Sequence, residues 1–159
     1  MSGRFDKSGT TLGLPVAAHV PGKTPRPADA LFDDLKGGLQ SCVMVDEFAD
    51  SAAFRGGIEA FDRGYFWESH ELLEAVWTRL PPASAERYLV QGLIHFANAC
   101  LKARMRRARA VCRIQERAEK SVTEAFLHGS KALMGVTQAN IDEWRRRVAM
   151  EMSCSENAR

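Results

Sequence analysis

The segment 85–104 constrains the fold most, because apolar residues occupy almost the whole circumference of the helix that it predicts. Ser84 precedes it as a candidate N-cap, and Glu86 places an acid in the first turn. A helix that is apolar nearly all round needs neighbours on several sides, so we expect it at the centre of a helical domain. One polar row interrupts its surface, formed by Gln91, His95, Asn98 and Lys102.

The flanking segments predict further helices and no convincing strand. Pro81 and Pro82 end the helix before the central one, Gly64 is a candidate C-terminal cap, and Asn140 is a candidate N-cap. The expected helices cover about 46–63, 66–79, 85–104, 106–127 and 140–151. The sequence therefore predicts an all-α fold, a single compact domain of about five helices.

Residues 1–45 differ in composition from the rest of the chain. Four prolines lie close together in LPVAAHVPGKTPRP, so this stretch is expected to be an irregular Pro/Gly-rich arm, either disordered or wrapped around the domain. A short helix over about 28–36 would end at Gly37 and Gly38. We expect the helical domain to span 46–152 and a frayed tail to span 153–159.

Composition and charge exclude several classes of protein. The chain has 159 residues, with 22 Lys and Arg against 20 Asp and Glu, a balance that argues against a polybasic membrane anchor or a general nucleic-acid coat. No apolar run approaches the ~20 residues of a membrane-spanning helix, and the N-terminus has no signal-peptide core. The four cysteines form no CxxC pair. We therefore expect a cytoplasmic protein without disulfides.

The predicted helix over 66–79 carries two polar residues on its apolar side. On a helical wheel, His70 and Glu74 lie inside the apolar stripe between Trp67 and Trp77, whereas Glu68 falls on the opposite, solvent-like face. A buried carboxylate costs several kcal/mol unless it is paired. For Glu74 the sequence leaves three partners open: His70, a basic residue on another helix, or a metal ion bound by both.

The short Pro-Pro turn predicts that the helices over 66–79 and 85–104 are antiparallel neighbours. We expect the polar row of the central helix to face His70 and Glu74 across a cleft. This cleft is the candidate site.

Two segments resemble a known family. GYFWESHELLEAVW and SAERYLVQGLIHFANACLK are similar to the bacterial and archaeal domain of unknown function 309, marked by HxxxExx followed by Trp or Tyr, here His70, Glu74 and Trp77. The resemblance covers roughly residues 20–125 and implies an all-helical fold with a metal at His70 and Glu74. The family commonly has glutamine where this chain has His95, so His95 would be an additional ligand.

The first hypothesis is a divalent-metal site, holding zinc, manganese or iron, in a helical protein that could be a metal-dependent enzyme of unknown reaction. His70 and Glu74 would be ligands, Glu71 a general base and His95 a third ligand. The residues expected to line the site or support its ligands are Trp67, Trp77, Gln91, Asn98 and Lys102.

The competing hypothesis is a metal-free polar core in a non-enzymatic helical interaction module. His70 and Glu74 would then hydrogen-bond each other, with Lys102 or Gln91 as a further partner. A third reading is a pocket in which Lys102 binds a small anionic molecule. The sequence leaves open whether the chain is an enzyme, and whether its partner is a small molecule or a protein.

An arginine-rich stretch covers residues 104–117. Such runs more often form a solvated helix face than a nucleic-acid site, so nucleic acid is not the expected partner. A one-sided arginine patch could still grip phosphate, and steep salt dependence of binding would reveal it.

Overall fold

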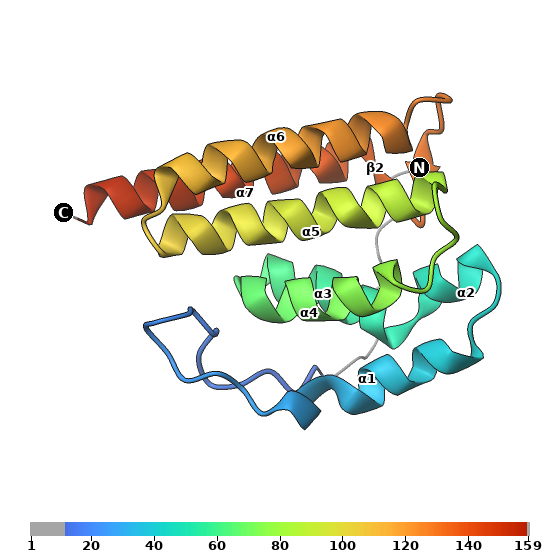
Figure 1. The fold of residues 1–159 in the computed structure, drawn as a ribbon, viewed down its shortest axis with the longest axis horizontal. Coiled ribbons are helices and arrows are strands. Elements are labelled where there is room, and N and C mark those ends of the chain that lie inside the picture. Colours follow the sequence, from blue (N-terminus) through green and yellow to red (C-terminus); the bar gives the residue numbers. More distant parts are fainter. Residues whose placement is uncertain (1–11, 159) are drawn as a thin grey trace.

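The computed structural model describes residues 12–158, and α-helices dominate that part of the chain (Figure 1). The described helices are α1 (Asp33–Gly37), α2 (Val45–Asp50), α3 (Ala52–Asp62), α4 (Phe66–Trp77), α5 (Ala85–Arg104), α6 (Ala108–Ala125) and α7 (Gln138–Asn157). Short 3-10 turns, Asp29–Phe32 and Gly38–Ser41, flank α1. The predicted all-α fold class is confirmed.

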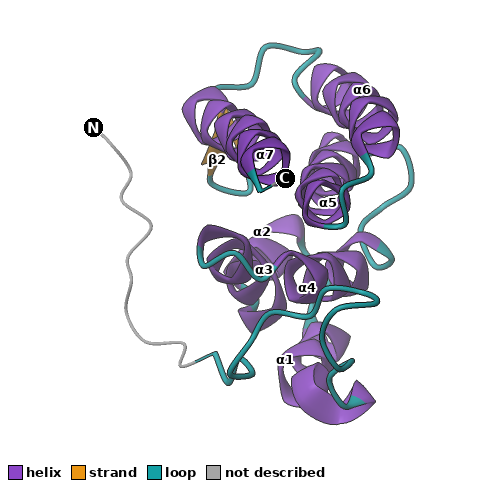
Figure 2. Cartoon of the chain, turned by 90° about the vertical axis from the view of Figure 1, so that its left-hand side faces the viewer, coloured by secondary structure: helices purple, strands orange, loops and turns teal. Residues whose placement is uncertain are grey.

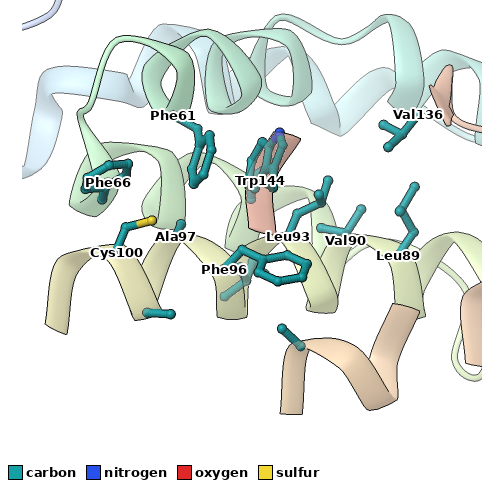
Figure 3. Packing of buried hydrophobic residues seen from close by; sticks show 14 of the residues in the cluster. Phe61, Phe66, Leu89, Val90, Leu93, Phe96, Ala97, Cys100, Val136 and Trp144 are labelled. Atoms are coloured by element: carbon teal, nitrogen blue, oxygen red, sulfur yellow. The ribbon is translucent and has the colours of Figure 1, made fainter. Parts of the chain in front are cut away.

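Helix α5 lies at the centre of the described bundle, as the sequence predicted. Figure 2 shows α4, α6 and α7 arranged around it, and these three helices make its main packing contacts. Leu89, Leu93 and Phe96 of α5 are fully buried. On the same core, Trp144 of α7 stacks on Phe61 of α3, with ring centroids 3.5 Å apart (Figure 3).

Helix boundaries differ from the prediction where a capping residue was read as helical. Ser51 has extended backbone and its Oγ accepts a hydrogen bond from the Phe54 N–H, so it separates α2 from α3. Thr137, not Asn140, is the N-cap of α7, and Asn140 is the reciprocal member of that capping box. Helix α7 continues to Asn157, so residues 153–157, expected as a frayed tail, are helical.

A small antiparallel hairpin, β1 (Ala132–Leu133) and β2 (Val136–Thr137), precedes α7. Met134 and Gly135 between the strands both have positive φ, as a tight hairpin turn requires. Two-residue strands are too short to show an alternating pattern, and this is why the sequence did not predict them.

The described part of the N-terminal arm lies against α3 and α4. Leu12 and Phe32 are buried in a small cluster with Ala60 and Leu72. The Tyr65 hydroxyl donates to the carbonyl oxygen of Pro15 over 2.8 Å. Residues 1–11 lie outside the described part of the chain.

Glu68 corrects the sequence analysis, which placed it on the solvent-like face of its helix. Its side chain is completely buried, because the arm covers that face of α4. One carboxylate oxygen accepts a hydrogen bond from the His19 backbone N–H over 2.6 Å, and Oε2 has no partner within residues 12–158. Burial raises the pKa of the Glu68 carboxyl above its usual value.

A second buried carboxylate, Glu151 of α7, joins that helix to α5. Arg104 donates to both of its oxygens over 3.1 Å, and Arg147 donates over 3.2 Å. Both guanidinium groups also lie over the Phe66 ring, at 4.3 and 5.3 Å from its centroid. Gly64, with a φ of 81°, closes α3 as expected, and a Cβ there would lie 2.9 Å from Arg104 Nη2.

Among the described residues, no helix combines the length and the apolar character needed to cross a bilayer. The four cysteines are all free thiols.

Candidate functional site

Helix α4 has one buried face and one solvent-accessible edge. Leu72, Leu73 and Val76 are fully buried. Ser69 is also buried, and its hydroxyl donates to the Gly57 carbonyl oxygen of α3 over 2.7 Å. The remaining edge carries the polar residues His70, Glu71 and Glu74. Because the buried positions fix the rotation of α4, they also fix where these three side chains lie.

The imidazole of His70 lies between two carboxylates. Its Nδ1 is 3.6 Å from Glu71 Oε1, and its Nε2 is 3.4 Å from Glu74 Oε2. One ligand atom from each of the three residues lies within 4.8 Å of the other two. Helical spacing explains part of this, since residues four apart lie on the same face.

The site is more open than the sequence suggested. The Glu74 side chain is 51% exposed, and those of His70 and Glu71 are 24% and 28% exposed. The expectation that Glu74 is buried in the apolar stripe is therefore wrong. Its position borders that stripe on the helical wheel, and here it lies at the solvent edge. The cost of an unpaired buried carboxylate applies to Glu68 instead.

Glu71 lies at the boundary between α4 and the arm. Its Oε2 is 3.8 Å from Nζ of Lys36, in α1. The sequence analysis assigned Glu71 as a base, but the structure also places it beside the potential ligands. The link from Glu71 to the arm through Lys36 was not anticipated.

The donor set fits a divalent cation. Bonds of about 2.1 Å in a tetrahedral site put neighbouring ligand atoms about 3.4 Å apart, which is the separation of His70 Nε2 and Glu74 Oε2. Glu71 lies beside the other ring nitrogen, Nδ1, so its side chain would have to move to share one ion with His70 Nε2 and Glu74. One imidazole and two carboxylates suit zinc, manganese or iron, and the exposed side leaves room for water.

His95 of α5 is half-buried on the same side of the bundle. Burial lowers its pKa, and electrostatic interactions with the nearby Arg117 and His70 lower it further. His95 is thus a neutral imidazole at neutral pH within electrostatic range of His70. It is not in the group of three whose ligand atoms converge.

The rest of the polar row on α5 is spread out. Gln91 helps to line a cavity of about 180 Å³ with Ala83, Arg87 and Tyr88. Asn98 and Lys102 are half-buried. Between residues 12 and 158, no side-chain hydrogen bond or ion pair joins either of them to His70, and the cleft expected between the two rows stays a hypothesis.

The two tryptophans of α4 contact other groups. Trp67 packs edge-on against the His19 ring of the arm, with centroids 5.0 Å apart. The guanidinium of Arg87 lies 4.2 Å from the centroid of Trp77, whose buried Nε1 has no hydrogen-bond partner within the described chain. Trp67 therefore holds the arm, and Trp77 borders the turn between α4 and α5.

Another cavity, of about 310 Å³, lies between α3 and α7, away from the group of three. Phe61 and Trp144 form its apolar side, with Arg146, Arg147 and Met150 around them. Arg147 is already bound to Glu151. This cavity has no converging ligand or acid–base set among the described side chains, so it is a weaker candidate than the edge of α4.

The sequence analysis missed the roles of Lys36, His19 and Glu68. Lys36 and His19 belong to the arm, whose path across α4 no local pattern predicts. The burial of Glu68 could be predicted only by knowing that the arm covers α4.

Comparison with known proteins supports the resemblance found in the sequence. No curated protein and no solved structure gave a match. The model of the family described as domain of unknown function (DUF309) matches residues 54–114, which run from α3 through α4 and α5 into α6. The HxxxExxW residues lie inside this range. Residues 54–114 of the chain are therefore similar to the DUF309 family.

Proposed function

We propose that the protein binds a divalent metal ion at His70, Glu71 and Glu74. The observation that carries the proposal is the convergence of one imidazole and two carboxylates, with ligand atoms within 4.8 Å, on a solvent-accessible edge of α4. In this proposal His70 and Glu74 are the primary ligands, because their separation already matches two ligands of one ion.

Glu71 is the third ligand in this assignment, in place of His95. Lys36 competes for the Glu71 carboxylate, so metal binding would release that ion pair. A three-ligand site leaves positions for water or for a small molecule, which is the arrangement of catalytic rather than structural metal centres. The metal would supply Lewis acidity there, and Glu71 could take up a proton if it leaves the ion.

The neutral state of His95 supports a role for this residue beside the metal. An imidazole held neutral at neutral pH can accept a proton or a hydrogen bond from a bound molecule. Gln91 and Lys102, on the same helix, would orient polar groups of that molecule. We therefore infer a metal-dependent reaction, or metal-assisted binding, of a small polar molecule.

The test is metal content and metal affinity of purified protein. Wild type, His70→Ala and Glu74→Ala would be compared by elemental mass spectrometry and by calorimetric titration with zinc, manganese and ferrous iron. The matched controls are His128→Ala and Glu124→Ala, which remove exposed residues of the same types elsewhere. We expect near-stoichiometric binding in the wild type and the controls, and a loss of at least tenfold in affinity in both site variants.

Equal affinity in wild type and both site variants would reject the site. Failure of all three metals to bind the wild type would reject the metal and favour a metal-free polar pair. Both side chains lie at a solvent-accessible edge of α4, with His70 24% and Glu74 51% exposed, and thermal unfolding of each variant checks that it is folded.

A further inference from the structure

The arginine-rich stretch of the sequence becomes an ordered row in the structure. On α6, Arg109, Arg113, Arg117 and Lys120 follow one another at intervals of three or four residues. At 100° per residue these four positions fall within about 80° of the helix circumference. All four are exposed. We call them the α6 basic row.

The four cations of the α6 basic row are not engaged in ion pairs in the described chain. Within residues 12–158, no ion pair joins any of its four members to an acid. Glu119, on another side of α6, is held by Arg145, with oxygens 2.7 and 2.8 Å from the guanidinium nitrogens. Glu116 and Glu124 lie on the same exposed face of α6 without an ion pair to the row, so this face carries two negative charges beside the four positive ones.

The opposite side of α6 is used for packing. Its buried residues, which contact α5, are Val111, Ala118, Ser121, Val122 and Ala125. The row therefore cannot turn inward, and Figure 2 shows α6 on the outside of the bundle. The fold displays four cations on one face of α6 over about 16 Å of helix.

We propose that the α6 basic row binds the phosphate backbone of double-stranded nucleic acid without regard to sequence. Over about 16 Å, one strand of a duplex presents about five phosphates, a charge pattern complementary to the row. Three of its four members are arginines, whose planar guanidinium groups match phosphate oxygens in pairs.

Other polyanions fit the row less well. Single-stranded nucleic acid is usually held by aromatic side chains that stack on bases, and the sequence of α6 contains no Phe, Tyr or Trp. A helix that binds membranes in the interface needs an exposed apolar face. None of the large exposed hydrophobic residues lies within α6, and its apolar face is buried against α5.

The experiment measures binding of the full-length protein to fluorescent 20-base-pair duplexes of two unrelated sequences, as salt is raised from 50 to 200 mM. Four phosphate contacts predict a log–log slope of about −3.6, a loss of about 150-fold in affinity over this range. The two duplexes should bind equally. Arg109→Gln, Arg113→Gln and Arg117→Gln combined should weaken binding at 50 mM salt and reduce the salt effect to about fourfold or less.

A control of equal charge change combines Arg55→Gln, Arg63→Gln and Lys131→Gln, all at exposed positions outside α6. It should bind like the wild type. The proposal is overturned if the wild type does not bind duplex at 50 mM salt, if its slope is near zero, or if the control loses as much affinity as the row variant. Binding to vesicles with one-quarter phosphatidylserine, without binding to duplex, would overturn it in favour of a membrane surface. Circular dichroism verifies that both variants are folded.

The α6 basic row is separate from the three proposed metal ligands, although Arg117 lies close enough to His95 to affect its electrostatics. Its test uses no metal, and the row variant retains His70, Glu71 and Glu74. Failure of one proposal therefore leaves the other intact.

Discussion

The clearest test of the packing concerns Glu151, which holds α7 against α5. Its side chain is 10% exposed and accepts three hydrogen bonds from Arg104 and Arg147, whose side chains are 28% and 24% exposed. Glu151→Gln keeps the shape and one acceptor oxygen. It replaces the other oxygen by an amide that points its own donors at a guanidinium.

The cost follows from these contacts. One or two of the three charged hydrogen bonds are lost, each contributing about 1.5–3 kcal/mol. The arginines reach water at about a quarter of their surface, so hydration recovers part of the loss. We expect the free energy of unfolding to fall by about 2–3 kcal/mol, below the ~3–5 kcal/mol for breaking a fully buried pair. For a chain of this size, that lowers Tm by about 4–12 °C.

The assay is urea unfolding at neutral pH and low salt, followed by circular dichroism, with Tm from a thermal scan. Glu143→Gln is the matched control, an exposed carboxylate on the same helix, and should change stability by less than about 0.5 kcal/mol. Combining Glu151→Gln with Arg147→Met should cost less than the two single changes added together, because the residues interact. A loss for Glu151→Gln no larger than that of the control would refute the reasoning.

Three further predictions concern α3, α4 and α7. Gly57→Ala should destabilise the fold by up to about 2 kcal/mol, because the new Cβ would lie 2.8 Å from Cγ of buried Leu73. This overpacking outweighs the gain in helix propensity. In urea unfolding, a stabilised variant would contradict the close approach of α3 and α4. Burial raises the pKa of Glu68 above its unfolded value of 4.5, so its contribution to stability is most favourable below pH 4.5 and declines as pH rises through the raised folded pKa. Urea titrations of wild type and Glu68→Gln over this range should therefore diverge as pH rises, and a constant difference would show that the carboxyl is not buried. Thr137→Ala should cost about 1 kcal/mol through loss of the α7 N-cap, and an unchanged urea midpoint would argue against that cap.

The sequence predicted the helices that are marked by a local pattern of apolar residues or prolines. The apolar circumference of 85–104 located α5 within a residue at each end, and the Pro81-Pro82 turn placed α4 next to it. Short features failed for a physical reason. Ser51 interrupts a continuous helical pattern because its hydroxyl caps the next helix, and the two-residue strands are too short for a period to develop.

The sequence predicted that His70 and Glu74 lie together on one face of α4, but not how exposed they are. The i, i+4 spacing brought His70 and Glu74 together, and the resemblance selected the same pair. Burial depends on contacts between segments that are distant in the sequence, and a helical wheel of a single segment does not show such contacts. Glu68 is buried because the arm covers it, and Glu74 is exposed because it lies at the edge of the bundle.

The way neighbours surround α5 has a consequence for how the chain folds. Its contacts with α4 and α6 join segments that follow one another along the sequence, whereas α7 returns to α5 after the hairpin and more than thirty residues. Contacts between sequence neighbours close short loops at low entropic cost and form early in folding. We expect α4, α5 and α6 to form the folding nucleus and α7 to dock after it. Substitutions in α7, such as Glu151→Gln, would then accelerate unfolding and leave the folding rate nearly unchanged.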